Sequence, residues 1–191
     1  MAGLSMLGAI CKLAEKRDSD VGGHLDRMAR YTGQLAHHAG IDDSWMFVLA
    51  ARTHDIGKVG IADGILFKPG PLLEEEFAVM KLHAQFGWDV LSPLKELKFH
   101  RMVDIAADIA YCHHEHWDGG GYPRGLSGED IPIAARCAAL GDCWDAVTTN
   151  RVYRRALWPD AARLVISSGA GKQFDPFLAE KFLELIDAGK L

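Results

Sequence analysis

Apolar residues recur every three or four positions along most of the chain, a spacing that places them on one face of an α-helix. The pattern predicts helices over residues 7–16, 24–40, 42–57, 74–91, 102–114, 133–149, 159–169 and 175–189. No segment shows the convincing alternation of apolar and polar residues that is typical of a half-buried strand. We therefore predict an all-α fold, built as a compact helical bundle.

Residues at the helix boundaries support this division: Gly40 lies at one helix end, Asp43 or Ser44 can cap the next helix, and Pro159 and Pro176 fall in first turns. Two stretches rich in glycine and proline, 59–72 and 117–132, interrupt the helical pattern directly after groups of ionisable residues. Long loops in such places often carry function.

Composition narrows the class of protein. With 191 residues, 49% of them apolar, and no break in composition, the chain predicts one domain, 1–191, in which 1–16 form the stub of an N-terminal linker helix. The net charge of −5 gives no general attraction to DNA or to anionic membranes, so a phosphate ligand would need local cations or metal. The four cysteines form no CxxC pair and no segment is long and apolar enough to span a membrane, so we expect a cytoplasmic protein.

Histidines and carboxylates supply the candidate chemistry. His54 and Asp55 are neighbours near the end of a predicted helix, about 100° apart around its axis, so both can face one cavity, and the Asp55 carboxylate can bridge two ions. Further candidates on other predicted helices are His24, His83, His113, His114 and Asp142. Imidazoles with carboxylates suit iron, manganese or zinc, and this number of donors exceeds the needs of one ion. We predict two divalent ions, with room for a third, in an arrangement suited to phosphodiester hydrolysis.

The order of six segments is specific: RDSDVGGH, THDIGKVGI, LHAQFGWDVL, HHEHWDGGGYP, ALGDCWDAVTTNRVYRRAL and KQFDPFLAEKF. From about Leu13 to about Ile186 the chain strongly resembles the HD-GYP domains, a subclass of the HD metal-dependent phosphohydrolases. The resemblance implies an HD-type helical bundle with iron or manganese in its core. It also implies an enzyme that hydrolyses cyclic di-GMP, a bacterial second messenger, to pGpG and slowly on to GMP.

The resemblance also assigns roles to positions. The implied metal ligands are His24, His54, Asp55, His83, His113, His114 and Asp142. Lys58 matches the lysine that contacts substrate phosphate, and with Asp55 it forms the expected catalytic pair. Gly121, Tyr122 and Pro123 match the GYP signature, in which the glycines allow a tight turn and Tyr122 and Pro123 form one lip of the substrate groove. Arg151 and Arg154 match the basic pair that meets the ligand's phosphates.

Asp20 departs from the pattern, since trimetallic members of the family carry glutamate four residues before the histidine that His24 matches. Asp20 is a further candidate ligand, but its side chain is shorter by one methylene. We therefore expect two firmly bound ions and a third at partial occupancy, with pGpG as the main product. The alternative is that Asp20 caps a helix that begins near Val21.

Other roles stay open on the sequence alone. Glu115, Asp118 and Asp145 can orient metal-binding histidines or can brace the fold. The alternatives to a cyclic di-GMP phosphodiesterase are a weakly catalytic cyclic di-GMP sensor or scaffold, and a phosphohydrolase of another nucleotide. The resemblance further implies an N-terminal receiver or sensory domain outside this chain, contact with a diguanylate cyclase through the GYP loop, and a homodimer formed through the N-terminal helix.

Overall fold

A computed structural model describes residues 23–96, 100–150 and 155–191. Its α-helices are α2 (His24–His38), α3 (Ser44–Ala51), α4 (Asp63–Leu66), α5 (Glu74–Leu91), α6 (His100–Cys112), α7 (Ile133–Thr148), α8 (Pro159–Gly169) and α9 (Pro176–Asp187). Short 3-10 helices are η1 (Ile56–Gly60), η2 (Ser92–Glu96) and η3 (Gly128–Asp130). Apart from one isolated bridge between Ala170 and Phe174, the described residues form no β-structure. The all-α prediction is confirmed.

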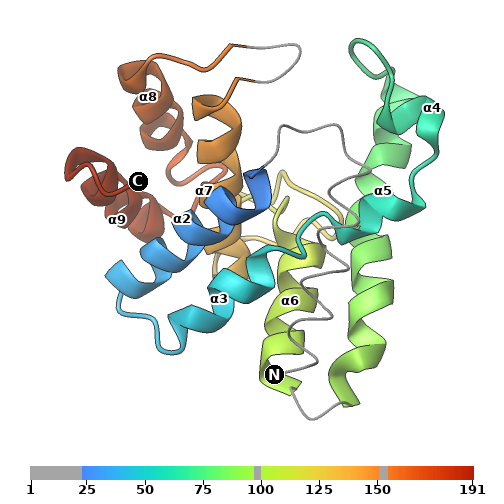
Figure 1. Cartoon of the computed structure of the whole chain (residues 1–191), viewed down its shortest axis with the longest axis horizontal. Coiled ribbons are helices and arrows are strands. Elements are labelled where there is room, and N and C mark those ends of the chain that lie inside the picture. The colour runs from blue at the N-terminus through green and yellow to red at the C-terminus, as the bar shows by residue number, and fades with distance from the viewer. Residues whose placement is uncertain (1–22, 97–99, 151–154) are drawn as a thin grey trace.

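The helices pack around one main core. Helix α2 packs against both α3 and α7, α5 lies beside α6, and α8 and α9 pack together next to α7 (Figure 1). The fully buried side chains of the core include Leu35 of α2, Ile109 of α6, Leu140 of α7 and Phe182 of α9. These helices place their apolar faces against this core, and burial of these faces is the main force that holds the bundle together.

The helix boundaries agree closely with the apolar pattern. Gly40 adopts a left-handed conformation, with φ of 72°, just beyond the end of α2. Pro159 and Pro176 occupy the first turns of α8 and α9, where a missing backbone N–H costs nothing. Asp43 occupies the N-cap position of α3, but its side chain makes no capping hydrogen bond and pairs with Arg101 instead.

Two local predictions were wrong. The helix predicted over 42–57 ends at Ala51, so His54 and Asp55 lie in a turn between α3 and η1 and not within a helix. The stretch 59–72, predicted to be irregular, contains the short helix α4. The predicted helix 7–16 lies outside the described residues.

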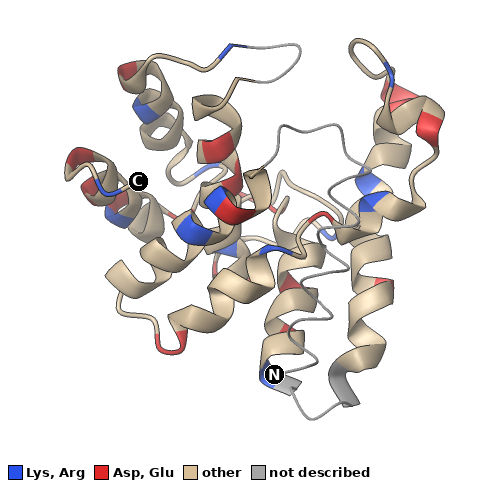
Figure 2. Ribbon diagram, viewed as in Figure 1, with Lys and Arg blue, Asp and Glu red and all other residues tan. Residues whose placement is uncertain are grey.

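Surface charge is mixed in sign. In the view of Figure 2, Lys and Arg residues are interspersed with Asp and Glu along the helices, in line with the small net charge of −5. Among the described helices, none has both the length and the hydropathy that a transmembrane span requires.

Candidate metal centre

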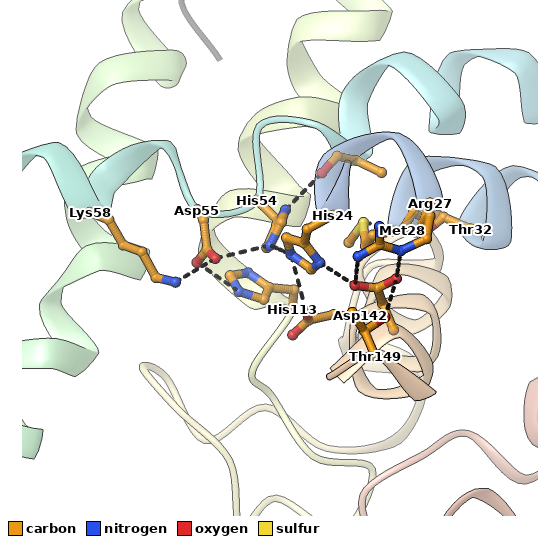
Figure 3. Close-up of polar contacts among 12 residues, drawn as sticks. His24, Arg27, Met28, Thr32, His54, Asp55, Lys58, His113, Asp142 and Thr149 are labelled. Atoms are coloured by element: carbon orange, nitrogen blue, oxygen red, sulfur yellow. Dashed lines mark hydrogen bonds and ion pairs between the residues drawn. The ribbon is translucent and has the colours of Figure 1, made fainter. Parts of the chain in front are cut away.

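Five separate elements place the candidate ligands. His24 is the first residue of α2, His54 and Asp55 lie in the turn after α3, His83 is within α5, His113 and His114 directly follow α6, and Asp142 is within α7. These elements meet inside the bundle, where the side chains approach one another (Figure 3). Most of the histidines are almost inaccessible to solvent, with relative exposure of 6% or less for His24, His54, His83 and His113.

The turn that carries His54 follows the end of α3 at Ala51, and its side chains bond to the last carbonyl groups of that helix. The last carbonyl groups of a helix lack partners within the helix and need donors from elsewhere. The Thr53 hydroxyl donates to the carbonyl of Ala50 at 2.7 Å, and the His54 Nδ1 bonds to the carbonyl of Ala51 at 3.0 Å. Both side chains are fully buried. The helix end and the orientation of the His54 ring are thus fixed by the same contacts.

Close approach of two backbones sets His83 beside this turn. A Cβ atom added at Gly57 would lie 2.0 Å from the carbonyl oxygen of His83 and 2.4 Å from the amide nitrogen of Gly87. No side chain fits in that space, so only glycine lets η1 rest directly on α5. This contact brings Asp55 to 3.4 Å from His83, measured between Oδ1 and Nε2.

Three histidine rings share one mode of attachment. In each, Nδ1 bonds to a backbone carbonyl on the preceding turn: His54 to Ala51 at 3.0 Å, His83 to Met80 at 2.7 Å, and His113 to Ile109 at 2.9 Å. Because a carbonyl oxygen can only accept, Nδ1 of His83 and of His113 carries the proton of the neutral ring and leaves Nε2 with its lone pair. The Nε2 atoms of His83 and His113 are buried and have no hydrogen-bond partner.

Two sets of donors share one carboxylate. One donor atom from each of Asp55, His83, His113 and His114 lies within 4.8 Å of all the others, and the same holds for His24, His54 and Asp55. Buried polar atoms without partners are costly, and a divalent cation would satisfy them. The residues therefore fit a divalent cation, and Asp55 is placed to serve two such positions.

Charge interactions within the cluster favour this protonation state. Burial and the neighbouring His54 lower the pKa of His113 to about 3. Burial also lowers the pKa of His83, and burial together with His113 lowers that of His114 well below its usual value. Neutral imidazoles are the form that binds metal.

Asp55 and His54 form the charged part of the cluster. Burial opposes ionisation of Asp55, but His54 and Lys58 outweigh it and hold the pKa of the carboxyl well below its usual range. Burial likewise disfavours protonated His54, yet Asp55 raises the pKa of that ring to about 9. The Lys58 Nζ lies 2.7 Å from Asp55 Oδ2. In this arrangement positive charge on His54 and Lys58 balances the ionised carboxylate.

The His24 ring contacts Asp145 through one nitrogen and faces His54 with the other. Its Nδ1 is 2.7 Å from Oδ2 of Asp145, and its Nε2 lies 3.4 Å from Nε2 of His54. Asp142 is more distant, with Oδ1 at 3.6 Å from His24 Nε2. Asp145 also accepts hydrogen bonds from Arg27, through Nε at 2.6 Å and Nη2 at 3.1 Å. Burial disfavours its charge, but the bonds from His24 and Arg27 lower the pKa of Asp145.

The three carboxylates left open by the sequence therefore separate into different roles. Asp145 orients a histidine. Glu115 is buried and accepts hydrogen bonds from the backbone N–H groups of Arg124 and Leu126, so it braces the following loop. Asp118 is exposed and accepts from the Gly120 N–H, which forms a local turn.

The GYP residues lie directly against the cluster. The Tyr122 ring stacks on His114, with 4.7 Å between ring centroids and 25° between planes. The Tyr122 N–H donates to the carbonyl of His114, and a Cβ atom at Gly121 would meet the backbone of residues 114–116 at 2.3 to 2.5 Å. Gly121 is thus needed for close approach. Pro123 is exposed beside Tyr122.

Three predicted site residues cannot be placed, and one residue near the cluster was not predicted. Asp20, Arg151 and Arg154 lie outside the described residues. Arg27 was not anticipated from the sequence. Its position one helical turn after His24 was a signal, but its pairing with Asp145, 118 residues away, could not be derived from the pattern.

The comparison with protein families identifies the fold. The family model described as "HD domain" matches residues 9–178. The chain belongs to the HD domain family. The HD family implies binding of divalent metal, and the His/Asp cluster described above could supply the ligands. The resemblance to HD-GYP domains is also confirmed, because relatives that are 37–42% identical over most of this chain are named cyclic di-GMP phosphodiesterases.

This HD domain is 42% identical over 187 residues to a "Probable cyclic di-GMP phosphodiesterase" of Vibrio cholerae, covering 92% of this chain and 42% of that protein. It is 38% identical over 177 residues to the "3'3'-cGAMP-specific phosphodiesterase 2" of the same organism, covering 92% of this chain and 33% of that protein. The chain thus spans less than half the length of these curated relatives.

Among solved structures, a cyclic GMP-AMP specific phosphodiesterase of V. cholerae superposes with a TM-score of 0.69 at 17% identity, over 96% of this chain and 48% of that chain. At this identity the superposition supports the fold alone.

Proposed function

We propose that this HD domain is a metal-dependent phosphodiesterase that hydrolyses cyclic di-GMP to pGpG and, more slowly, on to GMP. The observation that carries the proposal is the pair of donor sets that share Asp55, together with the buried, unpartnered Nε2 atoms of His83 and His113. The names of the curated relatives support the choice of a cyclic dinucleotide as substrate.

Two ions, of iron or manganese, would be held by the two sets. His83, His113 and His114 with Asp55 would hold one, and His24 and His54 with Asp55 and Asp142 would hold the other. Imidazole and carboxylate ligands without thiolate suit these metals. When bound, the ions would supply Lewis-acid polarisation of a phosphoryl oxygen and a nucleophile derived from water at neutral pH.

The remaining steps belong to residues of this chain. Asp55 is ionised and lies between the two sets, so it fixes their separation. Lys58 is partly exposed, with 23% of its side chain accessible, and its ammonium can donate to the substrate phosphate beside Asp55. Tyr122 covers His114 and limits access of water to that ring. Arg151 and Arg154 are proposed to bind the phosphates, and Asp20 to hold a third ion weakly.

The wider context is part of the same proposal. Residues 1–191 are proposed to form one HD-GYP domain that is joined through residues 1–16 to a receiver or sensory domain. Contact with a diguanylate cyclase through residues 117–132 and a homodimer remain predictions. They can be checked by pull-down with and without that loop and by light scattering.

The deciding experiment incubates manganese- or iron-loaded protein with cyclic di-GMP and separates the products by chromatography. We expect pGpG to accumulate first. Binding without turnover would contradict the proposal and favour the sensor. Preferential cleavage of 3'3'-cGAMP, offered in parallel because one relative is specific for it, would assign the domain to that second substrate.

Variants of the cluster test the metal site separately from turnover. We expect His113→Ala and Asp55→Asn to lose most of their bound metal and their activity. The first change removes a donor from one set, and the second removes the charge and one of the two oxygens of the carboxylate that both sets share. His38→Ala is the matched control, since His38 pairs with Glu184 on the surface. Metal content is measured by elemental analysis and helicity by circular dichroism. Full metal retention in both variants would rule out the proposed centre.

A further inference from the structure

The Tyr122 ring connects Lys81 to His114 of the candidate metal centre. Lys81 follows Phe77 by one turn of α5, and its Nζ is 4.9 Å from the centroid of the Phe77 ring and 5.3 Å from that of Tyr122. Tyr122 in turn stacks on His114. Two aromatic faces therefore hold the Lys81 ammonium beside the cluster, through cation–π attraction.

This ammonium has no charged partner. Lys58 pairs with Asp55 and Lys68 pairs with Glu76, whereas Lys81 makes no ion pair within the part of the chain that the structure describes. An ammonium carries three N–H donors, and aromatic faces offer no lone pair to accept them. Donors that point away from the two rings are thus open to an acceptor on a ligand.

An exposed aromatic face accompanies the donor. Phe77 is 45% exposed, so part of its ring is open to solvent. Exposed aromatic rings beside a cation form stacking surfaces for nucleobases in many nucleic-acid-binding proteins. A contact with phosphate would need only the ammonium, so the pair of ring and ammonium favours a base.

The chemistry of the donor selects among bases. Guanine presents two acceptors on one edge, O6 and N7, to which lysine can donate. Adenine presents an amino group at the position of O6, and its N–H groups would face the ammonium. A donor-only side chain at this place therefore favours guanine over adenine.

We propose that Phe77 and Lys81 recognise a guanine base of the cyclic dinucleotide, with the base stacked on the Phe77 ring and the Lys81 ammonium bonded to O6 and N7. This inference rests on the proposed function, because it assumes a cyclic dinucleotide at the metal centre. It adds two residues of α5 that contact substrate and leaves the phosphates to other cations.

Binding of three ligands tests the proposal: cyclic di-GMP, 3'3'-cGAMP and cyclic di-AMP, titrated calorimetrically into metal-loaded protein. Lys81→Met keeps an unbranched side chain that is shorter by one atom, and it removes the charge. We expect it to weaken binding of cyclic di-GMP roughly tenfold or more and to change binding of cyclic di-AMP little. Phe77→Ala should weaken binding of all three ligands, because stacking does not distinguish between purines.

The chain offers a matched control. Lys181 lies over the Phe177 ring of α9, also four residues apart, at 5.9 Å from the centroid, and it pairs with Glu184. Lys181→Met should leave all three affinities unchanged. Metal content should be equal in Lys81→Met and the unmodified protein, and Lys181→Met should also keep the hydrolysis of bis(p-nitrophenyl) phosphate, which has no base.

Two results would overturn the inference. Unchanged affinity of Lys81→Met for cyclic di-GMP would show that the base lies elsewhere, and an equal loss for cyclic di-AMP would show a phosphate contact. If the unmodified protein binds cyclic di-GMP but hydrolyses none of the three dinucleotides, the proposed function fails while the affinities still decide the role of Lys81.

Discussion

Asp145 connects the candidate metal centre to the rest of the protein. It is 1% exposed and accepts hydrogen bonds from His24 and, through two nitrogens, from Arg27. The bond to Nδ1 fixes which nitrogen of His24 carries the proton and leaves Nε2 facing His54. A carboxylate that contacts a candidate ligand, and not the metal position itself, can in this way set the geometry of that ligand.

The first prediction follows from this contact. Asp145→Asn keeps the volume but weakens the acceptor, so we expect the affinity for Mn²⁺ to fall about 10- to 100-fold. Calorimetric titration of the metal-free protein measures this change. Asp187→Asn, in a surface pair with Arg163, is the control for loss of a carboxylate. Equal Mn²⁺ affinities in the two variants would show that Asp145 only braces the fold.

At the scale of elements, the site depends on two backbone contacts without side chains between them. Gly57 lets η1 rest on α5, and Gly121 lets the GYP loop rest on the residues that follow α6. Glu115 holds the same loop by accepting two of its backbone N–H groups. These contacts join one main chain to another, and no flexible side chain between them can adjust. A small displacement of either element would therefore move the ligands that it carries.

Gly57→Ala is the second prediction. The new Cβ would overlap backbone atoms of His83 and Gly87, so we expect a loss of about 1–3 kcal/mol or more in the free energy of unfolding, and weaker metal binding. Gly64→Ala is the control, because no atom lies within 4 Å of a Cβ there and Gly64 is helical. It should be neutral or stabilising by up to about 1 kcal/mol. Urea unfolding of both variants gives the comparison, and similar stabilities would contradict the close approach.

At the scale of the whole molecule, a largely buried ion pair joins α7 to the start of α9. Arg136 Nη1 lies 2.6 Å from Oδ2 of Asp175, and their side chains are 13% and 5% exposed. Asp175 also caps α9 by accepting from the N–H groups of Phe177 and Leu178. This pair helps to hold α9 against α7, the helix that carries Asp142.

The third prediction concerns this pair. Asp175→Ala removes the cap and leaves Arg136 without its carboxylate, so we expect a loss of about 3–5 kcal/mol in the free energy of unfolding. Asp187→Ala removes a carboxylate from an exposed pair and should change stability little. Both are measured in metal-free protein, since bound metal would add to the stability of the folded state. Comparable losses in the two variants would contradict the role of the buried pair.

The sequence by itself determined the helices and the candidate ligands. The spacing of apolar residues, and boundary residues such as Gly40 and Pro176, are local signals in the sequence. They are sufficient to locate a helix when that helix buries one apolar face. His54 with Asp55, and His113 with His114, were identified by residue type and by the order of motifs. The end of α3 was missed, because the carbonyls of Ala50 and Ala51 are satisfied by the side chains of Thr53 and His54.

Only the tertiary structure decided how the ligands are held. His24 and Asp145 are 121 residues apart, and their contact depends on how α2 packs against α7. The sharing of Asp55 between two donor sets, and the position of Lys81 between two rings, depend in the same way on the packing of separate elements. Distances of a few ångströms between such residues are set by the whole core, because a packed interior leaves each side chain little freedom to adjust.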